Sequence, residues 1–176
     1  MENLDSLTHA NPNRPTCVTI GAFDGVHRGH QQVLQQLVAE TRGSCLRTAA
    51  LTFFPHPRQV LAKPVPRFYL TTPAERARLL HHYGVDLVIT HPFDRQVRMI
   101  RAADFVDMLI AHLDMRELWV GPDFALGYQR EGDVHFLQRQ GSAKGFVVHV
   151  ADFYAVDGQP VSSSLIREAI REGRID

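Results

Sequence analysis

The sequence predicts an α/β domain built on a mostly parallel sheet of at least five strands, with helices on both faces. Two observations carry this prediction. Apolar runs of strand length alternate along the chain with longer segments whose apolar residues recur at helical spacing. The 176 residues are enough for one domain with its own core, and they contain no internal repeat or low-complexity tract.

The first half of the chain alternates strand and helix after a polar N-terminal segment. Residues 1–15 have no apolar signal core, and we expect a disordered lead-in there. The elements predicted after it are a strand at Thr16–Gly21, a helix at Gly29–Thr41, a strand at Leu46–Phe53, a helix from Thr72 to about Tyr83, and a strand at Val85–Thr90. The helix at Thr72 has a strong start, because Thr72 can cap it, Pro73 suits its first turn and Glu75 can reach back to the cap.

The second half continues the alternation and ends in a helix. The predicted elements are a helix at Ala102–Leu113, a strand at Leu118–Gly121, a helix at Asp133–Gln140, a strand at Phe146–Val150, a turn at Asp157–Gly158 and a helix opened by Ser162–Ser164. Serine suits the start of that last helix, and Gly173 suits its end. We also expect a mobile flap over Arg58–Tyr69, where prolines and basic residues gather.

Charge and cysteine content exclude several classes of partner. Lys+Arg and Asp+Glu both number 19, so the formal net charge is zero and no basic excess points to nucleic acid or to an anionic membrane. Cys17 and Cys45 are too few for a disulfide framework, which suits a reducing compartment. No apolar run approaches the roughly 20 residues of a membrane span. We therefore expect a cytoplasmic protein with no nucleic-acid or membrane partner.

The most informative motif follows the first predicted strand. A glycine-containing turn, Gly21 to Val26, leads into His27-Arg28-Gly29-His30 at a predicted helix start. A helix start presents unpaired N–H groups and positive dipole to an anion, and Gly29 lacks the Cβ that would hold phosphate oxygens off the backbone. Both histidines can donate hydrogen bonds to charge that builds up in a transition state. These features favour a polyphosphate site.

Simpler explanations of the same residues stay open. Two histidines three positions apart also suit zinc, but zinc needs at least a third ligand, and no cysteine or acidic cluster follows at finger spacing. The histidines could instead lie on a solvated helix start without a function. Asp24 could close an Asx-type turn, hydrogen-bond a ligand or position His27.

Ser162-Ser163-Ser164 offers hydroxyls and free N–H groups at the start of the last helix, and Arg167 lies about one turn further on. Alone, this pattern is typical of a helix cap with a solvated surface charge. Together with the histidine motif, the pattern predicts a second phosphate-binding site, because the guanidinium of arginine can donate to two phosphate oxygens at once.

Two further segments follow predicted strands and suit a planar ligand. Pro55-His56-Pro57 could be only a rigid strand exit, or a stiff edge against which a flat ring lies. Gly121–Gly127 could be an ordinary loop, or a ligand loop with Phe124 as a stacking face, Asp123 as a polar anchor and Gly127 as the point of close approach. Ligands of open α/β sheets bind at the carboxyl ends of the strands, so we expect all four segments to converge.

Together the four segments closely resemble the bacterial FAD synthetase module, also called FMN adenylyltransferase, within the HxGH nucleotidyltransferase superfamily. The resemblance runs in order from about Thr16 to Asp176, whereas the histidine motif alone would indicate only the superfamily. It implies a Rossmann-like nucleotidyltransferase domain over residues 16–176. One departure is Ala22, where many relatives carry Asn.

The resemblance implies transfer of AMP from ATP to FMN, which gives FAD and pyrophosphate, with Mg²⁺ accompanying ATP and its protein ligands unassigned. It places ATP at Gly21, Phe23, Asp24, Gly25, His27, Gly29, His30, Ser162, Ser163, Ser164 and Arg167. It places the flavin at Pro55, His56, Pro57, Asp123, Phe124 and Gly127. His27, His30 and Arg167 would be the catalytic residues. Bifunctional relatives also carry a riboflavin kinase domain, which we expect only in a longer natural chain, so riboflavin phosphorylation is not implied here.

Two rival functions stay open. The first is another HxGH nucleotidyltransferase with a different acceptor, such as phosphopantetheine, nicotinamide mononucleotide or an alcohol phosphate. The second is a non-catalytic flavin- or nucleotide-binding module, which would bind flavin without ATP-dependent release of pyrophosphate.

Overall fold

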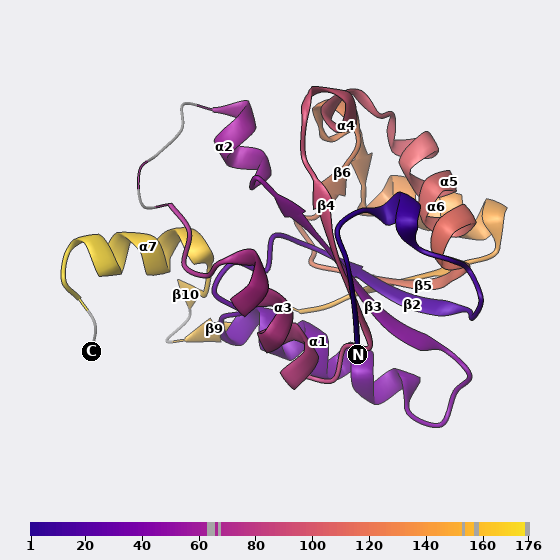
Figure 1. Cartoon of the computed structure of the whole chain (residues 1–176), viewed down its shortest axis with the longest axis horizontal. Helices are drawn as coiled ribbons and strands as arrows, with labels where there is room; N and C mark the ends of the chain where they lie inside the picture. The colour runs from indigo at the N-terminus through magenta and orange to yellow at the C-terminus, as the bar shows by residue number, and fades with distance from the viewer. Residues whose placement is uncertain (63–65, 67, 153, 157–158, 175–176) are drawn as a thin grey trace.

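A computed structural model describes the chain except for residues 63–65, 67, 153, 157–158 and 175–176. Within the described residues, six parallel strands form one central sheet (Figure 1). In spatial order the strands are β1 (Glu2–Leu4), β4 (Leu87–Pro92), β3 (Arg47–Phe54), β2 (Thr16–Ile20), β5 (Met115–Val120) and β8 (Val147–Val150). The predicted parallel sheet of at least five strands is confirmed.

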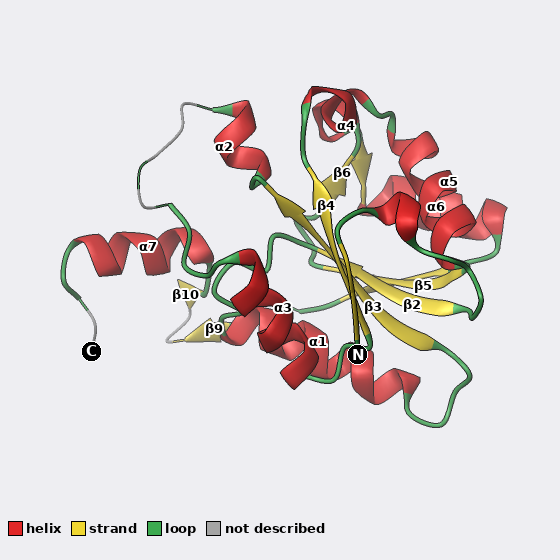
Figure 2. Ribbon diagram, in the orientation of Figure 1, coloured by secondary structure: helices red, strands yellow, loops and turns green. Residues whose placement is uncertain are grey.

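Helices cover both faces of the sheet, as predicted (Figure 2). One face carries α1 (Arg28–Thr41) and α3 (Pro73–His82), and the other carries α5 (Ala102–Leu113) and α6 (Val134–Lys144). Successive residues of a strand point to opposite faces. In β3, accordingly, Ala49 and Leu51 pack in the core beneath α5, whereas Ala50 packs with α1 and α3.

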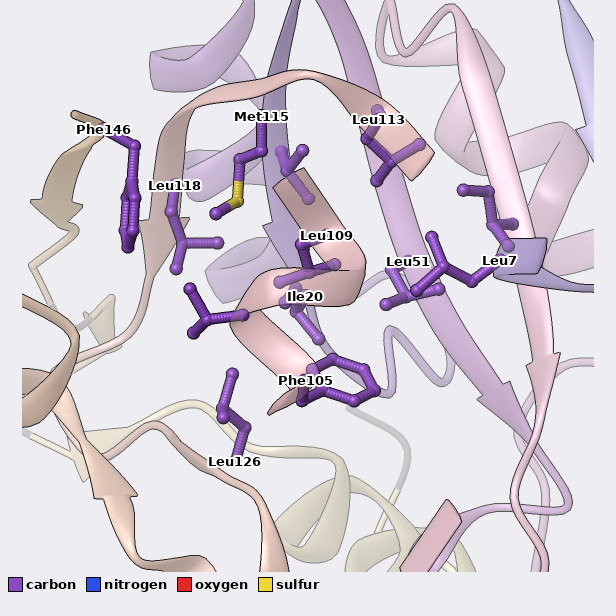
Figure 3. Packing of buried hydrophobic residues seen from close by; sticks show 14 of the residues in the cluster. Leu7, Ile20, Leu51, Phe105, Leu109, Leu113, Met115, Leu118, Leu126 and Phe146 are labelled. Atoms are coloured by element: carbon purple, nitrogen blue, oxygen red, sulfur yellow. The ribbon is translucent and has the colours of Figure 1, made fainter. Parts of the chain in front are cut away.

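The larger core surrounds α5 (Figure 3). Phe105, Leu109 and Leu113 recur every fourth residue, so they form one stripe that packs in the same core as Leu51 and Leu118. All five side chains are at most 4% exposed, and each such burial contributes about 1.5–3 kcal/mol to stability. This stripe fixes α5 on its face of the sheet.

The N-terminal segment is ordered, so the expected lead-in of disordered residues over 1–15 is wrong. β1 pairs in parallel with β4, and the 3-10 turn η1 (Leu7–His9) follows it. The Leu7 side chain is fully buried, and its backbone N–H donates to His91 Nδ1 at 3.2 Å. A three-residue edge strand is too short to show an alternating pattern, and its order comes from pairing with β4.

Several short elements were not predicted. They are α2 (Pro57–Leu61), α4 (Arg95–Met99), the 3-10 turn η2 (Tyr128–Arg130), the antiparallel pair of β6 (Ala125–Leu126) and β7 (Gly132–Asp133), and the antiparallel pair of β9 (Ala155–Val156) and β10 (Gln159–Pro160). The last helix, α7 (Ser163–Arg171), ends close to its predicted stop at Gly173. The predicted turn at 157–158 and residues 63–65 and 67 of the predicted flap lie outside the described residues.

The topology explains why site segments meet. The chain runs outward from central β2 to β3 and β4, then crosses back to β5 on the other side of β2. Because these strands are parallel, the carboxyl ends of β2, β3 and β5 lie at one edge of the sheet. The histidine motif, Pro55–Pro57 and Gly121–Gly127 therefore begin side by side at the point where the strand order reverses.

Candidate active site

The turn between β2 and α1 is compact and has unusual backbone angles. Phe23, Gly25 and Val26 have φ values of +47°, +80° and +38°. Positive φ is unfavourable for a bulky residue, and here it is held by packing, since Phe23 and Val26 are 3% and 2% exposed. A Cβ on Gly25 would lie 2.9 Å from Leu70 Cδ1, so both the angle and the space require glycine. The turn delivers His27 to the N-cap of α1.

The two motif histidines lie face to face. The rings of His27 and His30 stack with centroids 3.7 Å apart and planes 22° apart. The Phe23 ring meets His30 edge-on at 5.1 Å. Gly29 makes room for this stack, because a Cβ there would lie 3.3 Å from His27 ring atoms and 3.5 Å from the Val161 carbonyl oxygen. The start of α1 is therefore also in contact with the chain just before α7.

Both imidazoles are held in their neutral form. Burial, with a smaller contribution from nearby His27, lowers the pKa of His30 to about 3. Burial also lowers the pKa of His27, with a smaller contribution from Arg167. The Nδ1 atoms of His27 and His30 are buried and have no hydrogen-bond partner among the residues that the structure describes. Neutral imidazoles with free polar atoms can donate to, or accept from, a bound ligand.

These histidines predict an acid-sensitive fold. In the unfolded chain His30 has an ordinary pKa of about 6.5, whereas in the folded chain it stays neutral down to about pH 3. The unfolded state therefore binds the proton first, and the free energy of unfolding falls as the pH drops below about 6.5, by up to about 1.4 kcal/mol per pH unit for this group. Urea denaturation at pH 6 and pH 5 measures the loss. We expect a loss about 1 kcal/mol smaller in His30→Gln, and equal losses would contradict the assignment.

Asp24 is the centre of a buried hydrogen-bond network. Its fully buried carboxylate accepts from the Leu70 and Thr71 backbone N–H groups at 3.0 Å, and from the Thr71 hydroxyl at 3.1 Å. Arg167 Nη2 donates to it at 2.6 Å, and Arg76 Nη2 lies 3.5 Å away. Burial alone would raise the pKa of Asp24, but the Arg167 hydrogen bond and the backbone donors outweigh burial and lower it. The carboxylate thus connects the histidine turn (Gly21–His30) to the segment before α3 and to α7. The contact of Asp24 with ATP stays a prediction.

The start of α7 lies against the histidine turn. Ser162 caps the helix by accepting from the Leu165 N–H at 3.3 Å, and the Ser163 hydroxyl donates to the Asp24 carbonyl at 3.0 Å. The Arg167 side chain is 7% exposed, and its Nε donates to the Phe68 carbonyl at 2.7 Å. The interpretation of Arg167 as a solvated surface charge is thus wrong. In this structure its guanidinium engages Asp24 and Phe68.

The segment after β3 contacts the residues that precede α3 and the start of α7. The His56 backbone N–H donates to the Tyr69 hydroxyl at 2.9 Å, and the His56 ring lies 4.9 Å from the Phe68 ring. Arg58 Nη1 donates to the Ser164 hydroxyl at 3.2 Å, which links α2 to α7. His56 also caps α2, and burial lowers its pKa to about 4. The structure thus links Pro55–Pro57 to α7, which itself contacts the histidine turn.

The segment after β5 lies at the same edge of the sheet but makes different contacts. Phe124 packs against the core beneath α5, and the Asp123 carbonyl accepts from Arg130 Nη2 at 2.8 Å. Gly127 has φ +78° and ψ 176°, a region that is essentially restricted to glycine. A Cβ on Gly127 would lie 2.6 Å from the Ala102 backbone. The close approach predicted for Gly127 is therefore made to α5.

Gly127→Ala is expected to destabilise the fold by about 3 kcal/mol, because it combines a glycine-only conformation with a backbone clash. Gly145→Ala is the matched control: Gly145 has φ +80°, but no atom within 4 Å of its added Cβ. That control should cost about 1 kcal/mol. Urea denaturation measures both variants, and equal costs would contradict the packing role.

Sequence reasoning missed two residues of the network, Arg76 and Thr71. Arg76 is fully buried on α3, one position before Ala77 and four before Leu80, so it lies within the apolar stripe of that helix. An arginine at an apolar position of a helix was the available signal. Thr71 gave no signal, because its hydroxyl, which also accepts from the Gly25 N–H at 3.1 Å, acts only through tertiary contacts.

A surface groove of about 810 Å³ lies at the carboxyl ends of β3 and β4. Phe54, Pro73 and Thr90 are among its lining residues. The histidine turn does not line it, so the stacked imidazoles lie outside this groove.

Two searches of the described residues bear on ligand class. No group of three or more His, Cys, Asp or Glu side chains in the described part of the chain is placed to hold a metal ion. No helix in that same part has the length and apolar character needed to cross a membrane.

Comparisons with known proteins identify the family. The model of the FAD synthetase family matches residues 9–165. The chain is 36% identical over 176 residues to the bifunctional riboflavin kinase/FMN adenylyltransferase of Escherichia coli (strain K12), covering 99% of this chain and 56% of that protein. A putative bifunctional riboflavin kinase/FMN adenylyltransferase of Geobacillus thermodenitrificans (strain NG80-2) is 38% identical over 157 residues, covering 89% of this chain and 83% of that protein. The chain thus spans little more than half the length of the Escherichia coli relative.

A solved structure supports the fold. The crystal structure described as a macrolide-efflux protein from Streptococcus pneumoniae superposes with a TM-score of 0.85, at 23% identity, over 99% of this chain and 59% of that one. At this level of identity the likeness concerns the arrangement of strands and helices.

Proposed function

The chain belongs to the FAD synthetase family, and on that basis we propose that it transfers AMP from ATP to the phosphate of FMN, giving FAD and pyrophosphate. The observation that carries the proposal is the stacked pair His27 and His30, 3.7 Å apart at the start of α1, beside the start of α7. Two helix starts with neutral imidazoles between them suit a polyphosphate.

The proposed reaction needs no protein nucleophile. An oxygen of the FMN phosphate, already anionic at neutral pH, attacks the α-phosphorus of ATP in line with the bond to the β-phosphate. That bond breaks, and pyrophosphate leaves with its electron pair. The protein's task is to align the two phosphates and stabilise the charge on the α-phosphate oxygens.

The residues divide the task according to their position. We propose that His27 and His30 donate hydrogen bonds to the α-phosphate oxygens, because both imidazoles are neutral and have unpartnered atoms among the described residues. The other residues proposed to bind ATP lie in the turn and at the α7 start: Gly21, Phe23, Gly25, Gly29, Ser162, Ser163 and Ser164. Arg167 would hold the leaving pyrophosphate. Asp24 positions these segments through its buried carboxylate.

The flavin is proposed to lie next to the segments after β3 and β5. Pro55, His56 and Pro57 would form a stiff edge, supported by the contacts of His56 with Tyr69 and Phe68. Asp123 and Phe124 would border the ring from the other side of β2, while Gly127 shapes that loop against α5.

Mg²⁺ is proposed to enter as part of the substrate, bound by the phosphates of ATP and by water. The donor set fits this role, since the described residues form no cluster of three acidic, histidine or cysteine side chains. The metal would neutralise phosphate oxygens, while the chain's own groups orient them.

A competition among acceptors tests the proposal against another nucleotidyltransferase. Purified chain with ATP and Mg²⁺ is offered FMN, nicotinamide mononucleotide and phosphopantetheine together, and the products are separated by chromatography. We expect FAD as the main product. If FMN is used no better than the others, the acceptor is different. If flavin binds without any release of pyrophosphate, the chain is a non-catalytic binding module.

A further inference from the structure

Three charged side chains are buried together beneath the histidine turn. Asp24 and Arg76 are fully buried and Arg167 is 7% exposed. Arg167 Nη2 donates to Asp24 Oδ2 at 2.6 Å, whereas Arg76 Nη2 lies 3.5 Å from Asp24 Oδ1. One carboxylate thus faces two guanidinium groups, and the buried cluster has a net charge of +1. A buried charge without a partner is costly, so this imbalance calls for an explanation.

Arg76 has hydrogen-bonding capacity to spare. Its Nη1 donates to the Thr52 hydroxyl at 3.2 Å and approaches the Phe53 carbonyl at 3.4 Å. Its Nε and Nη2 are buried and have no hydrogen-bond partner among the described residues. Buried donors of this kind are rare in native structures. A shift of about 0.5 Å would bring Nη2 into normal hydrogen-bond distance of Asp24.

Arg167 cannot serve two anions with the same atoms. Its Nη2 is bound to Asp24, its Nε to the Phe68 carbonyl, and its guanidinium carbon lies 4.0 Å from the centre of the Phe68 ring. A phosphate held in the paired, two-nitrogen geometry predicted for Arg167 competes with Asp24 for Nη2. Asp24 would keep the Leu70 and Thr71 donors but lose its closest positive charge.

We propose that Arg76 is a positioning residue that becomes the counter-charge of Asp24 when Arg167 turns to the phosphates of ATP. The inference rests on the proposed function, because it takes ATP as the ligand. With ATP bound, Asp24 pairs with Arg76 and phosphate pairs with Arg167, so no buried charge is left over. Thr52 helps to keep Arg76 in place, since its hydroxyl also donates to the Ala22 carbonyl of the turn at 2.9 Å.

Calorimetric titration of the chain with ATP and Mg²⁺, without FMN, tests this role. In Arg76→Gln, Arg167 is the only counter-charge of Asp24, so ATP should bind about tenfold more weakly or worse. Arg76→Lys keeps the charge and should recover most of that loss. ATP binding that is unchanged in Arg76→Gln, or weakened equally in Arg76→Lys, would overturn the proposal.

A double-mutant cycle separates positioning from a general structural role. In the Arg167→Gln background there is no arginine to release, so Arg76→Gln should weaken ATP binding by less than about twofold. A merely structural residue would cause the same loss in both backgrounds, and that result would overturn the proposal. Thermal melting of each variant shows that the protein is folded at the temperature of the titration.

A crystal structure of the unmodified chain with ATP gives an answer that does not depend on how the variants fold. It should show Arg76 donating to Asp24, and Arg167 contacting phosphate. An unbroken bond between Arg167 and Asp24 with ATP bound would refute the exchange. The proposed function fails separately, if the chain binds ATP but forms no FAD from FMN. A chain that binds no ATP would overturn both.

Discussion

Replacing His30 with alanine is expected to lower kcat for FAD formation by about 10²- to 10³-fold, the cost of removing one donor to a developing oxyanion. His30 stacks on His27 and meets the Phe23 ring edge-on, which fixes the position of its imidazole. The binding of ATP should weaken less than kcat falls, because the proposed hydrogen bond strengthens as charge builds up in the transition state.

Steady-state kinetics with FMN and ATP measure this effect, and His135→Ala is the matched control. His135 lies on α6, on the opposite face of the sheet, and its side chain is exposed. The control should retain nearly full activity. A turnover near that of the wild type in His30→Ala would remove His30 from the catalytic role, whatever the control shows.

Asp24→Asn is expected to lower the free energy of unfolding by about 3–5 kcal/mol. The substitution removes the negative charge between two buried guanidinium groups, those of Arg167 and Arg76. It also turns an amide group toward donors such as the Leu70 and Thr71 N–H groups, which need an acceptor. The loss should be accompanied by loosening of α7, which Asp24 holds through Arg167.

Urea denaturation at pH 7 measures the stability, and Asp123→Asn is the control. Asp123 is exposed, and a surface change of this kind should alter stability by no more than about 0.5 kcal/mol. If Asp24→Asn costs less than about 1 kcal/mol, the carboxylate is not the charge centre described here.

Much of the fold follows from local pattern. The bounds of α5 agree with the prediction because its apolar stripe is regular. The capping box at Thr72 and Glu75 forms as predicted, with Thr72 accepting from the Glu75 N–H at 3.2 Å. The placement of the histidine turn and Pro55–Pro57 at one edge of the sheet could also be predicted, because both segments follow parallel strands. The α7 start instead follows the antiparallel pair of β9 and β10.

Tertiary contacts decide the features that were not predicted. β1 has only three residues, and its order depends on β4. From the sequence, Asp24 has several possible local or ligand roles, whereas the partners of its carboxylate lie 46 to 143 residues away along the chain. Arg76 interrupts an apolar helix face, and sequence alone does not say which carboxylate it faces. Gly127 is predicted to approach a ligand, and the sequence does not show that its backbone also lies against Ala102.

The formation of FAD from FMN and ATP tests the central proposal most directly. Purified chain is mixed with FMN, ATP and Mg²⁺, and flavin fluorescence is followed, because stacking of adenine on the flavin quenches it as FAD forms. We predict a steady fall in fluorescence matched by release of pyrophosphate, and no change with riboflavin in place of FMN. Constant fluorescence and no pyrophosphate, with a folded chain that binds ATP, would contradict the assignment of adenylyl transfer to this site.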